Sequence, residues 1–324
     1  GNVAVAAHPD VDYVIVQHPT ISPNDDGIKD FSLVRVGLLD TCSVLLMTVE
    51  DASSGTPLDT LLAAAGALPG VHSAEWRGEN AAGGLLAEGG YTLRIFASDG
   101  SESENRTTTV IVDVTAPLVA LDRIEPGICT PGVAGAAEKV IVYFSISRSG
   151  PGDTMSVTIT NPAAAKYDVP VGIDGDGVYS AEWSASSTAV DSIYTVDLAI
   201  ADEAGNSDAA RGFFDVDTKG PRITFLTSIP NPTNDPPLEI RGRCYDRNGI
   251  ESDSLSWNGG HYFLPDSSSS TGDTVLVWRF DAADSLAEGS GYREGKYTIK
   301  CKCRDRSGRE STASHTFRLD LTPP

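Results

Sequence analysis

One arrangement of residues occurs three times in this chain, at a nearly constant period. A tyrosine is followed eight residues later by an aspartate, and consecutive tyrosines are 103 residues apart. The three pairs are Tyr91 and Asp99, Tyr194 and Asp202, and Tyr297 and Asp305. A short segment after each pair ends in an Asp-x-x-x-Pro motif, at residues 113–117, 217–221 and 320–324. A repeat of this length matches a small domain rather than one turn of a solenoid, so the sequence predicts three tandem domains.

The residues around each tyrosine alternate in polarity with a period of two. In the second copy, Tyr194, Val196, Leu198 and Ile200 fall on one side of an extended chain. Such alternation predicts a half-buried β-strand. Further strands are predicted at Val11–Gln17, Phe31–Leu38, Val44–Val49, Thr107–Val112, Lys139–Ile146, Ser156–Thr160, Leu238–Cys244, Val275–Phe280 and Thr316–Leu321.

This density of short strands defines the expected fold class. About seven strands per roughly 100 residues, separated by Gly and Pro turn signals, are typical of an immunoglobulin-like or fibronectin-III-like β-sandwich. We therefore predict an all-β protein of three tandem sandwiches, with domains at residues 1–116, 117–220 and 221–324. The best helical pattern is Leu58–Leu68, an Ala- and Leu-rich run between Pro57 and Pro69, which predicts one or two turns of helix.

Three tryptophans share a place in the repeat. Trp76, Trp183 and Trp278 each precede the tyrosine strand, so we expect them to fill one core position in each domain. An exposed ligand platform is the alternative role. The Asp-Gly-Asp-Gly sequence at residues 174–177 predicts a tight hairpin turn, because Asp-Gly pairs readily adopt positive φ.

The net charge of −21 limits the classes of partner. It disfavours binding to nucleic acid and to anionic membrane surfaces, whereas a high density of carboxylates suits a divalent cation. No apolar run approaches the 18 or more residues that span a bilayer, and the first residues lack a signal-peptide pattern. Because the chain stops on the third Asp-x-x-x-Pro motif, we expect it to be a segment of a longer protein.

Five cysteines allow at most two intrachain disulfides and leave at least one thiol unpaired. Cys42 and Cys129 stand alone in their predicted domains, whereas the third domain has Cys244, Cys301 and Cys303. Cys301 and Cys303 share one strand face and are badly placed to bridge each other. Either could pair with Cys244 across the sandwich, and buried free thiols are the alternative.

The first domain resembles a known family through two motifs. Residues 76–91, WRGENAAGGLLAEGGY, are similar to the W-x-G-x-x-x-x-G-x-x-[LV]-x-x-G-x-Y signature of the immunoglobulin-like domain in flagellar hook-capping proteins. Residues 21–31, ISPNDDGIKDF, resemble the SPNGDGxND opening of such domains and of gliding-motility-type C-terminal domains, with Asp25 in place of a glycine. The second and third domains keep only part of the pattern. The resemblance implies a secreted bacterial protein at the cell surface, built from modular domains.

The loop from Asn24 to Asp30 is the sharpest candidate for cation binding. The side chains of Asn24, Asp26 and Asp30 and the backbone carbonyl of Ile28 place hard oxygen ligands at alternate positions, and Gly27 permits a tight turn. These four residues predict a calcium site. The alternative is an Asx-rich turn, in which the side-chain oxygens accept hydrogen bonds from backbone amides.

The aspartates of the domain linkers form a second candidate calcium set, consisting of Asp99, Asp113, Asp202 and Asp217. Resemblance to tandem bacterial immunoglobulin-like arrays implies that calcium among such groups stiffens the junctions. The alternative is that each aspartate holds a turn through hydrogen bonds to backbone N–H groups.

We found no catalytic motif: the five histidines are scattered without zinc-ligand spacing, and the sequence has no P-loop, GxSxG or HExxH motif. The sequence therefore predicts a non-catalytic, extracellular spacer, stalk or adhesive segment of a larger bacterial surface or secreted protein. Its expected partners are other domains of the same chain and a cell-surface protein or polysaccharide. Alternatives are carbohydrate-binding modules of a secreted enzyme and a subunit of a surface filament or layer.

Overall fold

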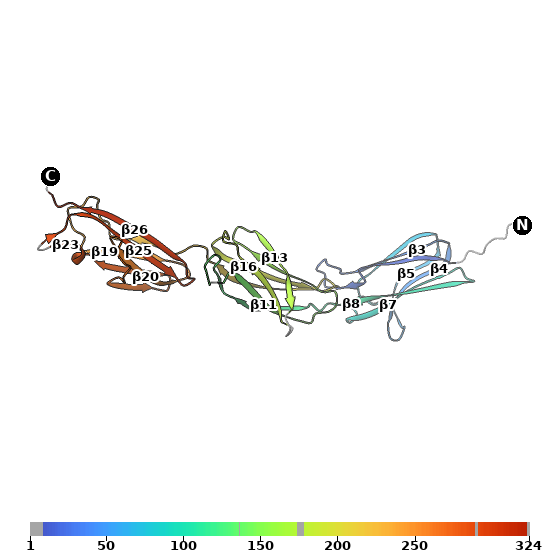
Figure 1. Ribbon diagram of the computed structural model, residues 1–324. Coiled ribbons are helices and arrows are strands. Elements are labelled where there is room, and N and C mark those ends of the chain that lie inside the picture. Colours follow the sequence, from blue (N-terminus) through green and yellow to red (C-terminus); the bar gives the residue numbers. More distant parts are fainter. Residues whose placement is uncertain (1–8, 136, 174–177, 289–290, 323–324) are drawn as a thin grey trace. The chain divides into compact units, whose positions relative to one another are not determined.

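The computed structural model describes residues 9–135, 137–173, 178–288 and 291–322, and nearly all of its regular structure is β-strand (Figure 1). Within these ranges the one helix is the single turn α1 (Ala283–Leu286). None of the described helical structure has the length and apolar character needed to cross a membrane.

Two sheets pack against each other in the N-terminal part of the chain. The first sheet has the strand order β1 (Val11–Gln17), β3 (Ser32–Leu38), β6 (Gly70–Trp76). The second has the order β2 (Thr20–Ile21), β8 (Ser103–Val112), β7 (Gly89–Ser98), β4 (Cys42–Asp51), β5 (Pro57–Ala67). Buried side chains from both sheets form one core, for example Val36 of β3 and Met47 of β4. This is the two-layer immunoglobulin arrangement.

The same arrangement recurs twice. The next pair of sheets has the orders β14 (Val171–Ile173), β15 (Tyr179–Ser184), β11 (Lys139–Ser147), β9 (Leu118–Glu125) and β10 (Ile128–Cys129), β17 (Ser207–Val216), β16 (Ser192–Ala201), β12 (Thr154–Thr160), β13 (Lys166–Val169). The last pair has the orders β18 (Arg222–Phe225), β19 (Glu239–Tyr245), β22 (Val275–Asp281), β21 (Ser267–Thr271) and β20 (Ile250–Trp257), β25 (Gly295–Asp305), β26 (Glu310–Leu319). A small ribbon of β23 (Ala287–Glu288) and β24 (Gly291–Tyr292) completes the described strands. The fold is therefore a tandem of immunoglobulin-like β-sandwiches.

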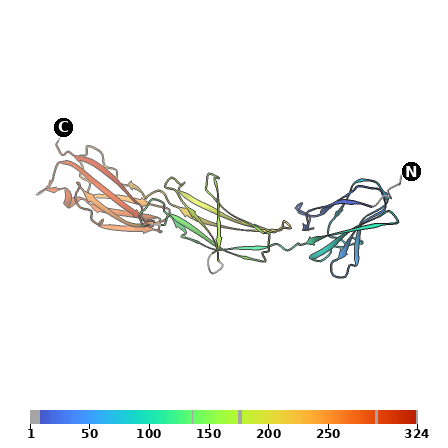
Figure 2. The ribbon, with the colours of Figure 1, turned by 45° about the vertical axis from the view of Figure 1, so that its right-hand side comes forward.

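We call the strands of residues 11–112, 118–216 and 222–319 the first, second and third modules. Among the described residues, each sheet takes all its strands from one module, as the colours of Figure 2 show. When the chain is divided into its most compact parts, it gives two units rather than three. One has residues 1–121, 144–156 and 198–210, and the other has residues 122–143, 157–197 and 211–324. The domain boundaries after residues 116 and 220 stay predictions.

Each repeated tyrosine lies near the start of a central strand and bonds to the backbone four residues upstream. Tyr91 Oη donates to the Ala87 carbonyl at 2.7 Å, and Tyr297 Oη donates to the Arg293 carbonyl at 2.6 Å. Tyr194 Oη accepts from the Val190 N–H at 3.0 Å. This is the tyrosine corner of immunoglobulin-like domains, which ties the entering loop to the core strand. It explains why tyrosine recurs at this position.

The tryptophans take equivalent positions on β6, β15 and β22. Trp76 and Trp278 are fully buried, whereas Trp183 is half-buried and lies 5.5 Å from the Tyr194 ring. Trp278 covers Gly242, where an added Cβ would lie 2.1 Å from the indole, so a side chain there would displace the ring. The predicted core role holds for Trp76 and Trp278 and in part for Trp183.

The helix predicted at Leu58–Leu68 is wrong, because this segment forms β5. It pairs antiparallel with β4 from Cys42↔Ala67 to Glu50↔Pro57. Isolated helices shorter than about 12–15 residues are marginal in water, and their stability comes mainly from tertiary packing. Here pairing with β4 satisfies the backbone N–H and C=O groups, and it outweighs the helix preference of alanine and leucine.

A disulfide in the third module joins Cys244 of β19 to Cys303 of β25, which settles which of the two candidate cysteines is the partner. Cys42, Cys129 and Cys301 are buried free thiols. The hairpin turn predicted at residues 174–177 lies outside the described residues.

The tyrosine corner can be tested in the third module. Tyr297→Phe removes the donor to the Arg293 carbonyl but keeps the ring, so we expect this module to lose about 1 kcal/mol of unfolding free energy and roughly 4–8 °C in melting temperature. Differential scanning calorimetry measures the shift. The exposed Tyr262, replaced in Tyr262→Phe, is the control. Equal shifts for the two variants would contradict the role of the hydroxyl.

Candidate functional site

The turn between β16 and β17, residues 202–206, contacts the end of the first module. Asn206 Nδ2 donates to the backbone carbonyl of Asp113 at 2.9 Å, and Ser22 Oγ donates to Asn206 Oδ1 at 2.5 Å. Lys29 Nζ donates to the Glu203 carbonyl. All five residues belong to one compact unit of the chain. We call this contact the first junction.

Gly205 shapes the first junction in two ways. Its φ of 96° lies in the left-handed region that favours glycine, as the turn requires. An added Cβ would also lie 2.5 Å from Cγ2 of Ile28, so a larger residue would push the Asn24–Asp30 loop away. That loop is therefore part of the first junction.

The corresponding turn of the third module, residues 305–309, makes an equivalent contact with the second module. Arg309 Nε donates to the backbone carbonyl of Asp217 at 2.9 Å, and Arg309 Nη2 donates to the Pro131 carbonyl. Arg309 follows Asp305 by four residues, as Asn206 follows Asp202. We call this contact, which also lies within one compact unit, the second junction.

The four predicted linker aspartates all hold turns. Asp113 Oδ1 accepts from Thr115 N at 3.1 Å, and Asp217 Oδ1 accepts from Lys219 N at 3.2 Å. Asp99 Oδ1 accepts from Ser101 N at 2.7 Å and Asp202 Oδ1 from Asn206 N at 2.9 Å. These bonds match the turn-forming alternative. Calcium binding by this set of four stays a prediction.

A second repeated contact in the linkers was missed by sequence reasoning. Glu88 Oε1 accepts from Thr115 Oγ1 at 2.6 Å, and Glu294 Oε1 accepts from Thr322 Oγ1 at 3.1 Å. Asp191 Oδ2 accepts from the Thr218 N–H at 3.2 Å in the same way. The signal was present, because an acidic residue stands three positions before each repeated tyrosine.

The Asn24–Asp30 loop is held together by its own polar side chains. Asn24 Oδ1 accepts from Asp26 N at 3.1 Å, Asp26 Oδ1 accepts from Ile28 N at 2.7 Å, and Asp30 Oδ2 accepts from Gly27 N at 2.9 Å. This network has the form of the Asx-rich turn. Asp30 Oδ1 is buried and has no hydrogen-bond partner. The proposed calcium ligands Asn24, Asp26, Ile28 and Asp30 thus lie in one loop, and no observation tests whether they bind an ion.

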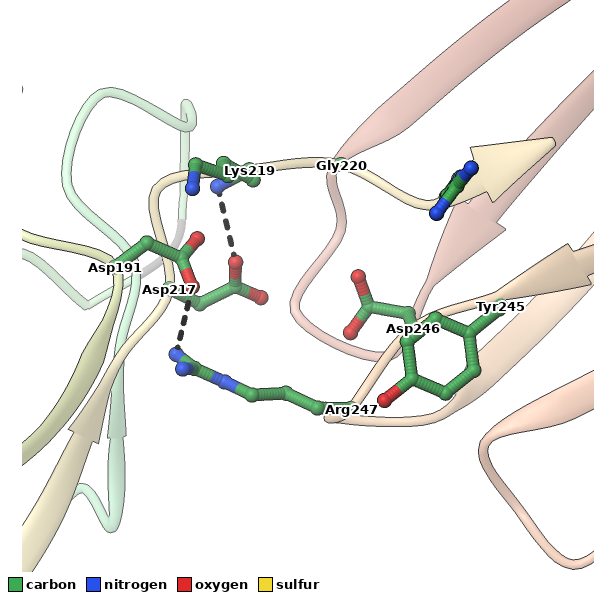
Figure 3. A pocket seen from close by; sticks show the side chains of 8 residues that line it. Asp191, Asp217, Lys219, Gly220, Tyr245, Asp246 and Arg247 are labelled. Carbon is green, nitrogen blue, oxygen red and sulfur yellow. Dashed lines mark hydrogen bonds and ion pairs between the residues drawn. The ribbon is translucent and has the colours of Figure 1, made fainter.

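The second junction also contains a group of buried carboxylates. Asp217, Asp246 and Asp305 are 2%, 8% and 0% exposed, and one oxygen of each lies within 4.8 Å of the others. Figure 3 shows the carboxylates of Asp217 and Asp246 facing each other across a pocket that Asp191 and Arg247 also line. Sequence reasoning missed Asp246, which follows β19 in a Tyr-Asp-Arg-Asn-Gly turn.

Burial and like charges perturb these acids. Burial raises the pKa of Asp246 to about 6. The hydrogen bond from the Asn248 N–H lowers this pKa, whereas the nearby negative charges of Asp217 and Asp305 raise it further. Burial also raises the pKa of Asp305 above its ordinary value. Arg247 Nη2 contacts Asp191 at 3.1 Å and Asp215 at 2.5 Å, and these pairs sit beside the group. Negative charge is therefore concentrated where module ends meet.

Comparison with protein-family models and with curated proteins gives no match. Among solved structures, a tetra-tandem repeat from the extending region of a large adhesion protein is 18% identical, covering 97% of this chain and 75% of that one, with a TM-score of 0.34. A Ca²⁺-stabilised adhesin with which an Antarctic bacterium binds ice is 15% identical, covering 96% and 74%, with a TM-score of 0.38. A 1.5-MDa bacterial ice-binding adhesin is 14% identical, covering 97% and 100%, with a TM-score of 0.33. Identities and TM-scores this low do not transfer a function to this chain.

Asn206 is expected to stabilise the first junction. Asn206→Ala leaves the Asp113 carbonyl, the buried Ser22 hydroxyl and Asp202 Oδ2 without their partner, so we expect the free energy of unfolding to fall by about 1–3 kcal/mol. Denaturant titration followed by circular dichroism measures the loss. The exposed Asn234 gives the matched control Asn234→Ala. A loss no larger than that of the control would show that the contact is not formed in solution.

Proposed function

We propose that this chain is a non-catalytic extracellular segment that acts as a spacer, stalk or adhesive shaft in a larger bacterial surface or secreted protein. The observation that carries the proposal is the repetition of one contact. At each junction, the turn before the last strand of a module bonds to the carbonyl of the aspartate that ends the preceding module, through Asn206 to Asp113 and through Arg309 to Asp217.

A repeated junction suits a mechanical role. Short linkers with proline already limit the freedom of the chain, and a second, side-on contact opposes bending about the linker. Because the contact joins a hairpin turn to the end of a strand, it leaves the faces of the sheets free. The proposal therefore assigns the spacing function to the junctions rather than to a pocket.

Two further features suit an extracellular location. The Cys244–Cys303 disulfide is of a kind that persists in oxidising compartments. The net charge of −21 keeps neighbouring copies apart by repulsion. Under this proposal the partners are other domains of the same chain and a cell-surface protein or polysaccharide. The same hypothesis includes a relationship between the first module and hook-capping and gliding-motility-type domains. It also includes calcium binding at the Asn24–Asp30 loop and among the linker aspartates.

Stretching single molecules by their ends in chelator tests the proposal. We expect three separate unfolding events, and the first and second modules each release roughly 340 Å of chain at about 3.4 Å per residue. In the third module the disulfide withholds the segment from Cys244 to Cys303, whose ends are 59 positions apart in the sequence. Its release is therefore shorter by roughly 200 Å under non-reducing conditions.

Reductant is the internal control, because it is expected to lengthen only the third event. Two events instead of three, or a single one, would contradict separately folded modules. If the modules unfold without a measurable force peak, as an already unfolded chain extends, the mechanical role would be contradicted.

One observation favours a second function, in which the second module binds carbohydrate. Trp183 is half-buried and lies 5.8 Å from the ring of Tyr167, and both line a pocket with Asn161. Aromatic faces beside amide groups suit sugar binding. The two rings are inclined by 56°, so they do not form one flat platform.

A glycan-binding array separates the two functions. The spacer proposal assigns no sugar site to the second module, so any glycan binding by the chain is expected to be unchanged in Trp183→Ala. Saturable binding that Trp183→Ala abolishes and Trp257→Ala leaves intact would favour the carbohydrate-binding function instead.

A further inference from the structure

Three carboxylates at the second junction come from separate segments of the chain. Asp217 follows β17, Asp246 follows β19, and Asp305 ends β25. Their oxygens lie within 4.8 Å of one another, and all three residues are buried. Calcium binds oxygens at about 2.3–2.6 Å, so two of its ligands can be up to roughly 5 Å apart. The spacing of the three carboxylates therefore fits one calcium ion.

Two oxygens of this group have no hydrogen-bond partner. Asp217 Oδ2 and Asp305 Oδ2 are buried and unpaired, whereas the Oδ1 atoms of the same residues accept bonds from Lys219 N and Arg309 N. A buried charged oxygen without a partner is costly, and burying several like charges together adds to that cost. In Asp217 and Asp305, hydrogen bonds within the turns thus occupy Oδ1 and leave Oδ2 available to a ligand.

The nearby arginines do not neutralise the group. Arg247 is paired with Asp191 and Asp215. Arg309 reaches Asp217 Oδ1 only at 3.9 Å, and its N–H groups donate to the carbonyls of Asp217 and Pro131. Arg309 is thus the one arginine with an ion-pair contact to the group, and Lys219, Arg222 and Arg247 line the adjoining pocket without an ion pair to Asp217, Asp246 or Asp305 in the described residues.

At the first junction an amide donor meets the corresponding carboxylate oxygen. There Asn206 Nδ2 donates to Asp202 Oδ2 at 2.9 Å as well as to the Asp113 carbonyl. Arg309 occupies the corresponding position at the second junction but turns to carbonyls, so Asp305 Oδ2 has no such donor. Among the described residues, no group of three carboxylates as tight as Asp217, Asp246 and Asp305 occurs at the first junction.

We infer that Asp217, Asp246 and Asp305 bind a calcium ion at the second junction. The inference rests on the proposed spacer function, because the ion would join Asp217 of the second module to two residues of the third. All three ligands are hard oxygen donors, a set that suits calcium or magnesium rather than zinc or copper. Calcium is favoured because it accepts irregular sets of carboxylates, whereas magnesium demands octahedral geometry. The pocket in Figure 3, lined by Asp217 and Asp246, gives the ion and its waters a path from solvent.

Isothermal titration of the chelator-treated, full-length chain with CaCl₂ tests the inference. We expect the wild-type protein to bind an ion that Asp246→Asn binds at least tenfold more weakly. Asn at this position keeps the oxygen that accepts the Asn248 N–H and removes only the charge. The control is Asp235→Asn, which removes an exposed carboxylate of the third module outside this group and is expected to keep the wild-type affinity and stoichiometry.

Three results would overturn the inference: no calcium binding by the wild-type chain, unchanged binding by Asp246→Asn, or equal loss in Asp235→Asn. A parallel titration with MgCl₂ is expected to give weaker binding, and equal affinity would overturn the assignment to calcium. Circular dichroism establishes whether Asp246→Asn is folded.

A second measurement does not depend on that variant. Tb³⁺, used in place of Ca²⁺, emits when a nearby tyrosine is excited, and Tyr245 lines the pocket beside Asp246. Tyr245→Phe is expected to lower the calcium-displaceable emission by at least half, and unchanged emission would overturn the site. Because the stretching experiment is done in chelator, three unfolding events without calcium binding would remove this inference and leave the spacer function standing.

Discussion

The hydrogen bond from a hairpin turn to the carbonyl at the end of the preceding module is the interaction on which the rest of this structure depends. It requires an aspartate to hold the turn, a glycine to close it and a donor at the fifth residue of the turn, as Asp202, Gly205 and Asn206 show. The tyrosine corner, in turn, fixes the strand that leads into the turn, through Tyr194 Oη and the Val190 N–H. In the second and third modules the repeated residues therefore serve one structural demand, which is to present a defined turn to the preceding module.

The two junctions meet this demand with different chemistry. At the first junction the Asn206 amide gives one carboxylate and one carbonyl a neutral donor. Arg309 supplies a longer, charged side chain that reaches the carbonyls of Asp217 and Pro131 and leaves buried carboxylate oxygens unpaired. Similar backbone geometry thus produces a contact through a neutral donor in one place and a contact through a charged donor, beside unpaired carboxylate oxygens, in the other.

Much of the fold could be predicted from the sequence because period-two alternation and turn residues are local signals. The predicted strand Val11–Gln17 matches β1 residue for residue, and the repeated tyrosines lie on central strands. Local signals failed where tertiary contacts decide. Pairing with β4 made β5 a strand, and the position of each cysteine across the sandwich chose Cys303 over Cys301 as the partner of Cys244. The proximity of the three carboxylates could not be predicted from the sequence, because only the fold brings Asp217, Asp246 and Asp305 together. The Asn24–Asp30 loop lies in a junction, which no local pattern reveals.

Residual dipolar couplings of backbone amides test the central account most directly, because they report whether successive modules share one orientation. The account predicts that a single alignment tensor fits the amides on both sides of each junction, and that Asn206→Ala uncouples the first junction but not the second. Separate tensors for the modules of the wild-type chain, or a single tensor that Asn206→Ala leaves unchanged, would contradict it.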